Sequence, residues 1–566
     1  MKRTLLILWM IPVTLWSQDR YAIIIDEILA DPSPSVGLPP YEWVELKNRS
    51  DMPINLAGWT MGDRTGTSGP LPPYLLPPDS FVLVCSSGGF ASLSAIGPTL
   101  SITGFPSLDN DGDELFIANA DGQTIHAVRY EVSWYQNHLK ESGGWSLEMI
   151  DTQNPCGGLG NWTASLDPRG GTPGRKNSVD SFYPDQIGPV ILNGYTANDS
   201  TLVLLADEPL DSGYASNPDH YHFTPDLPVY TAELIGPVFD RIQLITRPLD
   251  PHTIYTLQAL SITDCHGNQA GKPSHLRIGI PSTSEERDLV INEILFNPVS
   301  GGSDFVELYN RSQKIIDASR LYIANRNSSG AAGSFRLVSA GPRYLYPGDY
   351  LVMTEDRVRL SVDFRVQNPD AVVEVTSLPS YPDDRGTVLL MDLSGKIIDE
   401  VSYSEKWQFS LLSNTEGISL ERLDPAGASQ DPGNWHSAAS TAGFGTPGYR
   451  NSQAGYSSLA DPGIQINPAV FSPDNDGRDD ITQIHYQVKE PGWVANIIIF
   501  DSGGYLVRRL VGNQIMGLEG TWSWDGLGDS SNPLAPGVYV LYIELFNLRG
   551  QIQRIKKAVV LAKSFR

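Results

Sequence analysis

The chain has few basic residues and few cysteines for its length, and its interior has no long apolar run. Its 566 residues hold 40 Lys and Arg against 65 Asp and Glu, a formal net charge of −25 at pH 7. Nucleic acids and anionic membranes attract clustered Lys and Arg, so this acidity argues against both as partners. Beyond the N-terminus, no stretch reaches the ~18 continuous apolar residues of a transmembrane helix. We therefore predict no transmembrane segment in the mature chain.

The three cysteines, Cys85, Cys156 and Cys265, match no zinc-binding spacing. An odd number leaves at least one thiol unpaired within the chain. Cys85 and Cys156 fall in the same repeated region and can pair, but the sequence leaves their pairing open.

The N-terminus is typical of a signal peptide. Lys2 and Arg3 form a positive region, and residues 5–16 form an apolar stretch too short to span a bilayer. Ser17-Gln18 is a suitable cleavage point after a small residue. We therefore predict that residues 1–17 are a signal peptide and that the chain is exported, which permits disulfides.

The main organisational feature of the sequence is an internal repeat. An Ile-Asp/Asn-Glu-Ile-Leu block, a Val-Glu-Leu block and a closing Gly-Thr-Pro-Gly occur twice in the same order. The matching blocks are residues 25–32 and 291–298, 43–50 and 305–312, and 171–174 and 445–448. The blocks are short, rich in β-branched residues and bounded by Pro, Gly, Asn and Asp, as strands are. Regularly spaced short strands indicate a sandwich or a barrel.

These motifs, with Gly58-Trp59, resemble the lamin tail domain. The resemblance covers residues 18–180 and 286–453 and implies a compact Ig-like β-sandwich in each copy. The second copy lacks the Gly-Trp pair, and it has Asp399 where the first has His126. We interpret both differences as packing variation.

Two further segments resemble other Ig-like domains. Residues 186–282, with an Asp-x-x-Gly-Asn turn at 264–268, resemble the bacterial Ig-like domain first known from surface-layer proteins. Residues 463–566 resemble the Ig-like domain of the flagellar hook-capping protein, which recurs at the C-termini of exported bacterial proteins, including type IX secretion cargo. The last apolar strand, residues 556–563, fits either an export signal or an ordinary final strand. The predicted fold is all-β, with four β-sandwich (Ig-like) domains in series after the signal peptide.

Two acidic runs are candidate cation sites. The first holds Asp474, Asp476, Asp479 and Asp480 around a glycine, and alternating oxygen ligands of this kind can bind Ca²⁺. The run lacks the final Glu of an EF-hand loop, and a solvated turn is the alternative. The second run, residues 109–114, keeps only its glycine in the second copy, as Gly386. That pattern favours a hairpin turn with a positive φ over a metal site.

Glu27 with Glu45, and Glu293 with Glu307, form paired carboxylates in both copies. A glycosidase needs two such groups across a cleft. We favour the alternative, in which they bond to backbone or to neighbouring Arg and Lys at a sheet edge. The chain has no Gly-x-Ser-x-Gly, His-Glu-x-x-His or phosphate-loop motif, so we predict that it is not an enzyme.

The tryptophans bear on carbohydrate binding, because exposed tryptophans can form a sugar-binding platform. We expect four of them to lie in domain cores instead. They are Trp43, Trp59, Trp162 and Trp435.

The functional prediction is an exported, non-catalytic protein, secreted or held on the outer surface of a Gram-negative bacterium. Its role is structural or adhesive display of β-sandwich modules, and its predicted partners are surface proteins or polysaccharides, with secretion machinery at the C-terminal domain. Ca²⁺ is the candidate cofactor. The alternatives are a carbohydrate-binding accessory of a surface degradative system and a hydrolase with an unrecognised site.

Overall fold

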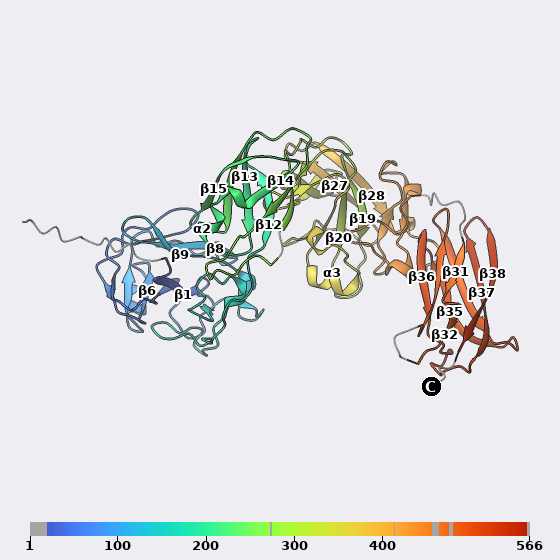
Figure 1. The fold of residues 1–566 in the computed structure, drawn as a ribbon, viewed down its shortest axis with the longest axis horizontal. Coiled ribbons are helices and arrows are strands. Elements are labelled where there is room, and N and C mark those ends of the chain that lie inside the picture. Colours follow the sequence, from blue (N-terminus) through green and yellow to red (C-terminus); the bar gives the residue numbers. More distant parts are fainter. Residues whose placement is uncertain (1–19, 272–273, 413, 456–462, 475–478, 563–566) are drawn as a thin grey trace, which may run out of the picture. The chain divides into compact units, whose positions relative to one another are not determined.

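The structure is a computed structural model that describes residues 20–271, 274–412, 414–455, 463–474 and 479–562 (Figure 1). Strands dominate these residues, and the longest helix among them, α3 (Arg357–Asp363), has seven residues. No helix in this described part is long and apolar enough to cross a bilayer. The predicted all-β fold with several β-sandwiches is confirmed. The predicted signal peptide, residues 1–17, lies outside the described residues.

The chain forms two compact units, Met1–Ile280 and Pro281–Arg566. Each unit contains one copy of the repeat, and we call residues 18–180 module 1 and residues 286–453 module 2. Residues 186–282 are called the spacer, and residues 463–566 the C-terminal segment. The exact boundaries between these four segments stay a prediction.

Module 1 has two main facing sheets and a small two-stranded sheet formed by β3 (Ile54–Asn55) and β5 (Leu75–Leu76). The larger sheet has the order β11-β10-β1-β2-β6-β7 and the smaller one β4-β8-β9. The strands are β1 (Ile23–Leu29), β2 (Trp43–Asn48), β4 (Thr60–Gly62), β6 (Phe81–Cys85), β7 (Thr99–Ser101), β8 (Gly112–Ala118), β9 (Thr124–Glu131), β10 (Leu147–Met149) and β11 (Trp162–Ala164). The main core lies between the sheets and includes Val44, Met61 and Leu115.

Module 2 repeats this topology and adds one edge strand, β23, to the smaller sheet; its two-stranded sheet is formed by β21 (Ile316–Asp317) and β24 (Tyr344–Leu345). Its sheets have the orders β26-β25-β20-β19-β29-β30 and β23-β22-β27-β28. The strands are β19 (Leu289–Leu295), β20 (Phe305–Asn310), β22 (Leu321–Arg326), β23 (Ala332–Leu337), β25 (Tyr350–Thr354), β26 (Val372–Glu374), β27 (Arg385–Asp392), β28 (Ile397–Ser404), β29 (Leu420–Arg422) and β30 (Trp435–Ser437). Both modules also have a β-bulge at the same place, in β1 after Ile25 and in β19 after Ile291.

The bulge determines which side chains reach the outer face of the larger sheet. Every residue of β1 is buried, because a second apolar cluster that includes Leu29, Trp43 and Leu83 covers that outer face. Side chains alternate along a strand, so Glu27 and Glu45 lie on the face of this second cluster. The outer face of the sheet therefore holds both apolar side chains and carboxylates.

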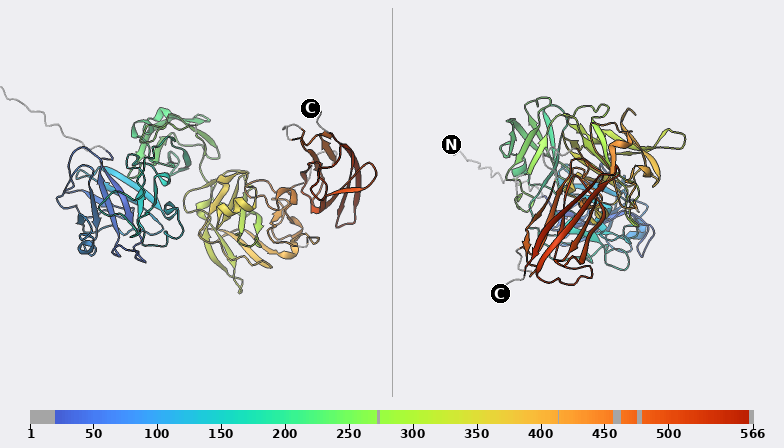
Figure 2. Two further views of the ribbon diagram at one scale, coloured as in Figure 1. Left: turned by 90° about the horizontal axis from the view of Figure 1, so that it is seen from below. Right: turned by 90° about the vertical axis from the view of Figure 1, so that its right-hand side faces the viewer.

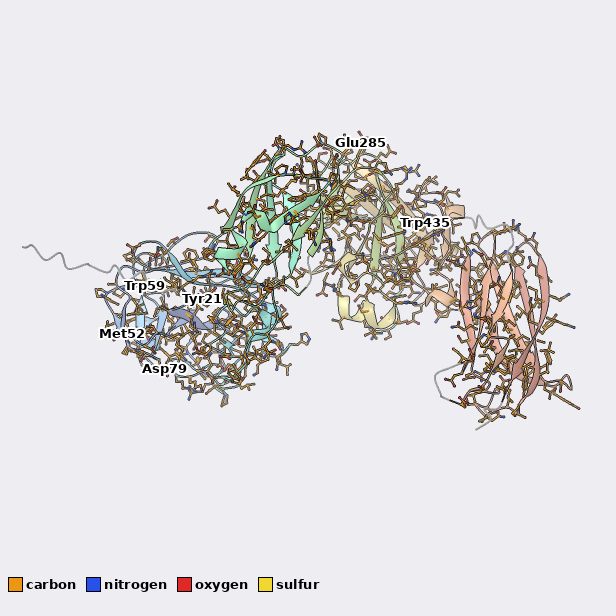
Figure 3. The ribbon with its side chains drawn as sticks, in the orientation of Figure 1. Tyr21, Met52, Trp59, Asp79, Glu285 and Trp435 are labelled. Carbon is orange, nitrogen blue, oxygen red and sulfur yellow. A yellow bond between two sulfur atoms is a disulfide. The ribbon has the colours of Figure 1, made fainter. Side chains whose placement is uncertain are left out.

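The four tryptophans lie in module cores, as predicted. Their exposed fractions range from 0% at Trp43 and Trp162 to 3% at Trp435. Figure 3 shows Trp59 within module 1 and Trp435 within module 2. Because the rings are covered by their own modules, these four residues form no exposed sugar-binding platform.

The spacer is a two-sheet sandwich with its own core. Its sheets have the orders β12-β13-β16-β15 and β14-β17-β18. The strands are β12 (Ile191–Thr196), β13 (Thr201–Ala206), β14 (Tyr221–Thr224), β15 (Val229–Ile235), β16 (Arg241–Thr246), β17 (Tyr255–Ala259) and β18 (Ser274–Ile278).

Module 1 and the spacer are joined inside their unit. A disulfide links Cys156 to Cys265, with their Cα atoms 6.3 Å apart, and Cys85 is a buried free thiol. Cys85 and Cys156, whose pairing the sequence left open, therefore do not pair. Arg129 of module 1 also forms an ion pair with Asp240 of the spacer. A covalent bond and a half-buried ion pair thus connect the two domains.

The C-terminal segment is a further two-sheet sandwich, whose long strands run alongside one another in red in Figure 2. Its strands are β31 (Ile464–Asn467), β32 (Val470–Phe471), β33 (Thr482–Gln487), β34 (Trp493–Phe500), β35 (Leu506–Ile515), β36 (Glu519–Trp524), β37 (Gly537–Asn547) and β38 (Ile552–Leu561). Within its unit it shares a small apolar cluster with module 2, in which Phe409 packs with Val494 and Ile515. Gln453 Nε2 also donates to the Met516 carbonyl at 3.0 Å.

Candidate functional site

Three glutamates lie side by side on adjacent strands in each module. In module 2, Glu293 on β19 stands opposite Glu307 on β20 and opposite Glu421 on β29. Module 1 has the same register. Its three glutamates are Glu27, Glu45 and Glu148. All six side chains are 0% exposed, so both clusters are buried within the modules.

The closing segment of each module lies directly on its cluster. In module 2, the Thr446 amide donates to Glu293 Oε1 at 2.9 Å, and the Thr446 hydroxyl donates to Glu421 Oε1 at 2.8 Å. The Gly448 amide donates to Glu307 Oε2 at 2.7 Å. The repeated Gly-Thr-Pro-Gly motif therefore supplies one donor or more to every glutamate of the cluster.

Module 1 forms the same contacts. The Thr172 amide donates to Glu27 Oε1 at 2.7 Å, and its hydroxyl donates to Glu148 Oε1 at 2.9 Å. The Gly174 amide donates to Glu45. Gly174 has a φ of +79°, where a side chain would be strained, and Gly448 has +86°. The last glycine of the motif thus lets the backbone turn its amide toward the carboxylate.

The predicted role of the paired glutamates is confirmed in part. They bond to backbone, as expected, and their other partners are hydroxyl groups such as those of Ser146 and Ser419. The predicted location at a sheet edge is wrong, because β2 lies between β1 and β6 in the interior of its sheet. Sequence reasoning also missed Glu148 and Glu421. The signal that would have found them is the Ser-Leu-Glu shared by both copies.

The electrostatics of the clusters follow from their burial. Burial, reinforced by the carboxylates of Glu148 and Glu421, raises the pKa of Glu27 and of Glu293 to about 8. Each cluster therefore retains protons at neutral pH. Because the glutamates face their own closing segment and are out of contact with solvent, the arrangement clamps that segment to the sheet and offers no carboxylate to a ligand.

The two clusters differ at the bulged residue. In module 2, Asn292 Nδ2 donates to Glu307 Oε1 at 2.8 Å and to Asn451 Oδ1 at 2.7 Å. Module 1 has Asp26 at this place, and a carboxylate has no N–H to donate. Both Asp26 oxygens and Glu45 Oε1 are buried and have no donor among the described residues. Burial raises the pKa of Asp26 to about 7, so module 1 holds one more acidic group than module 2.

A second difference lies beneath the bulge. In module 1, the Ile25 amide donates to His126 Nδ1 at 2.8 Å, and His126 Nε2 bonds to the Pro155 carbonyl at 2.8 Å. In module 2, the Ile291 amide donates to Asp399 Oδ2 at 2.8 Å. His126 and Asp399 thus accept the same backbone amide, so the difference between the copies is a structural one inside the modules and includes an equivalent hydrogen bond.

Asp399 also forms an ion pair with a buried arginine. Arg422 donates to Asp399 Oδ2 at 2.9 Å, and the Arg422 side chain is 0% exposed. Its Nε donates to the Ile291 carbonyl at 2.7 Å. Module 1 has Met149 at the strand position of Arg422 and the uncharged His126 at the position of Asp399. Module 2 therefore has an ion pair at these two positions, and module 1 has two uncharged side chains.

The predicted calcium loop is partly described. The Asp474 amide donates to Asp480 Oδ1 at 3.2 Å, and Asp479 has a φ of +53°. Asp476 lies outside the described residues. Calcium binding by Asp474, Asp476, Asp479 and Asp480 stays a prediction. In the second acidic run, Gly112 has the expected positive φ of +143°, but Gly386 does not.

Two further groups of potential metal ligands were missed by sequence reasoning. Asp185, Glu208 and Asp264 place one carboxylate oxygen each within 4.8 Å of one another, and burial raises the pKa of Glu208 to about 8. Cys156, Cys265 and His266 form the second group. Both bring together residues far apart in the sequence, so a local spacing could not have shown them.

Comparison with known proteins supports the repeat. The family model of the Lamin Tail Domain matches residues 17–131 and 282–405. The matched regions include the first two glutamates of each cluster and end before Glu148 and Glu421. No curated protein matches the chain.

Several solved structures are similar to the chain at low identity. The N-terminal part of the bacterial S-layer protein SbsC is 12% identical over 29% of this chain and 40% of that chain, with a TM-score of 0.16. This chain thus spans less than half of that structure. A DUF4876 family protein from Bacteroides thetaiotaomicron is 13% identical over 36% and 81% of the two chains, with a TM-score of 0.16. PorZ, a surface component of the type IX secretion system of Porphyromonas gingivalis, is 9% identical over 92% and 74%, with a TM-score of 0.16.

Proposed function

We propose that this chain is an exported, non-catalytic protein of the bacterial outer surface that displays two lamin-tail-like modules as rigid binding or structural units. One observation carries the proposal. The paired carboxylates, which are the groups best suited to catalysis in both modules, are buried and hydrogen-bonded to the closing segment of their own module. They act as internal clamps, and ligand contact is left to the surface loops.

The disulfide supports the exported location. Cys156 and Cys265 are 109 residues apart and join two domains. Disulfides persist in oxidising compartments and are rare in the cytosol. The signal-like residues 1–17 and the resemblance of residues 463–566 to the C-terminal domains of exported proteins support the same route. On this proposal, the C-terminal segment contacts the secretion machinery, and the modules contact a surface protein or polysaccharide.

Ligand contact is expected in the loops where the modules differ, because the strands and the clamp are shared. Loops on a rigid scaffold are where binding residues concentrate. Hydrogen bonds within each module fix the scaffold, so a ligand can bind without rearranging the core.

The proposal is tested with the full chain on intact cells and on ligand arrays. We expect protease added to intact cells to digest the chain, because it is exposed at the surface. We also expect the purified chain to retain a surface polysaccharide or protein whose mass is unchanged after recovery. Protection from protease in intact cells would refute the location. A ligand recovered as cleaved product would identify a hydrolase and refute the non-catalytic role.

A further inference from the structure

Three side chains from two domains meet at the joint between module 1 and the spacer. Cys156 comes from the loop that follows β10, and Cys265 and His266 come from a turn after β17. Nδ1 of His266 lies 3.3 Å from Cys156 Sγ and 3.4 Å from Cys265 Sγ. The imidazole nitrogen therefore faces both sulfur atoms of the disulfide.

The other ring nitrogen fixes the tautomer of His266. Its Nε2 lies 3.0 Å from the carbonyl oxygen of Gln153. A carbonyl can only accept, so Nε2 carries a hydrogen, and in the neutral imidazole Nδ1 presents a lone pair to the sulfurs. This second contact is the one that orients a histidine ligand in metal sites. A disulfide has no proton to donate to that lone pair.

The turn that carries His266 is held in place. Asp264 is 0% exposed, and its Oδ1 accepts from the amides of His266 at 2.8 Å and Asn268 at 2.9 Å. Asn268 Nδ2 donates to Asp264 Oδ2 at 2.7 Å. The position of the imidazole is thus set by its own turn and by the Gln153 carbonyl, and it does not depend on the disulfide alone.

We propose that, once the disulfide is reduced, Cys156, Cys265 and His266 bind a soft divalent cation such as Zn²⁺. In a tetrahedral site with Zn–N of about 2.0–2.1 Å and Zn–S of about 2.3 Å, a nitrogen and a sulfur ligand lie about 3.6 Å apart. The observed separations of 3.3 and 3.4 Å are close to this value. Two sulfur ligands lie about 3.8 Å apart in the same geometry, so the sulfurs need only separate by side-chain rotation.

The chemistry balances with an external dithiol as reductant. The dithiol gives two electrons and two protons to the disulfide and becomes a disulfide itself, which leaves Cys156 and Cys265 as thiols. Each thiol then loses its proton when it binds the metal, so two protons are released for each ion. The neutral imidazole of His266 binds through the lone pair of Nδ1 and releases no proton. His266 is exposed, so water can reach the fourth ligand position.

In this proposal the metal and the disulfide are alternative links between the same two domains. The newly made chain has the thiols. An external disulfide then takes two electrons from the two thiolates and becomes a dithiol, the metal ion is released, and the Cys156–Cys265 disulfide forms. The inference is independent of the proposed surface function, because it rests on three side chains and their supporting contacts.

The test uses the full chain, reduced and kept without oxygen, and titrated with Co²⁺ as a spectroscopic substitute for Zn²⁺. We expect one thiolate-to-cobalt charge-transfer band that saturates at one ion per chain, and none in the oxidised chain. Cys85 stays in every variant as a control thiol. Cys156→Ser should abolish the band. His266→Ala should weaken binding by at least tenfold, because changes even to supporting residues cost about 10–100-fold.

A thermal melt separates a folding defect from a binding defect. Zn²⁺ should raise the Tm of the reduced wild-type chain and leave the Tm of the Cys156→Ser/Cys265→Ser variant unchanged. The proposal is overturned if the reduced chain shows no charge-transfer band, or if the band persists in Cys156→Ser. A band of unchanged affinity in His266→Ala would show that the histidine merely packs against the disulfide.

Discussion

Replacing Asp399 by alanine is expected to destabilise module 2 by about 3–5 kcal/mol, because it leaves the fully buried Arg422 without its counter-ion. The Ile291 amide loses its acceptor in the same step. Native-state hydrogen exchange on the full chain measures this change at the amides of β19. The amides of β1 in module 1 provide an internal control, and their protection should not change.

The matched control places the two corresponding residues of module 1 in module 2. The Asp399→His/Arg422→Met variant recreates His126 and Met149, so it removes the ion pair as a whole and keeps an acceptor for the Ile291 amide. Replacing both members of a buried pair costs far less than removing one. We expect the double variant to retain more protection than Asp399→Ala. If the double variant is less stable than Asp399→Ala, His126 and Met149 cannot replace Asp399 and Arg422, and the proposed equivalence of the two modules at this position is wrong.

Replacing Asp26 by asparagine is expected to stabilise module 1 at alkaline pH. The folded pKa of Asp26 is about 7, above the ordinary value of about 3.9. The stability that its protonated form contributes is present below about pH 4 and is lost as the pH rises through 7. A shift of about three units corresponds to about 4 kcal/mol at pH 8. Asparagine removes this loss and can donate to Glu45 as Asn292 donates to Glu307.

The charged groups around Asp26 also change its pKa. The carboxylates of Glu148, Asp180 and Asp79 raise its pKa further, and Lys47 lowers it. Glu45 Oε1 is buried and accepts no hydrogen bond among the described residues. Hydrogen exchange at β1 should show a gain in Asp26→Asn that is large at pH 8 and small at pH 5. The wild type and the Asp26→Asn variant both contain His126, so its titration cancels when the stabilities of the two proteins are subtracted.

The reverse exchange serves as the control. Asn292→Asp should weaken module 2 at pH 8, because it places a carboxylate beside Glu307 where module 2 has Tyr309 in place of Lys47. Equal effects of Asp26→Asn at pH 5 and pH 8 would show that Asp26 does not take up a proton on folding. The pH dependence would then have to arise elsewhere in the cluster.

Much of the architecture was predictable from the repeat. Short blocks that recur in order identify strands, and the larger sheets of the two copies have the same strand order in the structure. Glu27 and Glu45 could be paired from sequence because they lie in the longest repeated blocks. Glu148 was missed because Ser-Leu-Glu is short, and its position beside Glu27 depends on a strand contact 121 residues away in the chain.

The finer features of the site depend on contacts that a sequence does not show. Cys156 pairs with Cys265 across two domains, whereas the sequence left the partner of Cys156 open. Gly386 is kept for space, since a Cβ there would lie 2.4 Å from the Tyr403 hydroxyl, and not for a positive φ. His126 and Asp399 differ in chemistry but accept the same amide. The shared role of these two side chains can be recognised only when the backbone amide that each one accepts is known.

We propose that the repeated glutamates clamp the closing segments and take no part in chemistry on a ligand. The most direct test is hydrogen exchange at the Thr446 amide, which donates to Glu293 at 2.9 Å, in the full-length Glu293→Ala variant. Our account predicts that Thr446 and Gly448 lose protection while Thr172 in module 1 keeps it, and that any ligand retained by the wild type is still recovered intact. Unchanged protection at Thr446, together with the loss of a catalytic activity, would contradict the account.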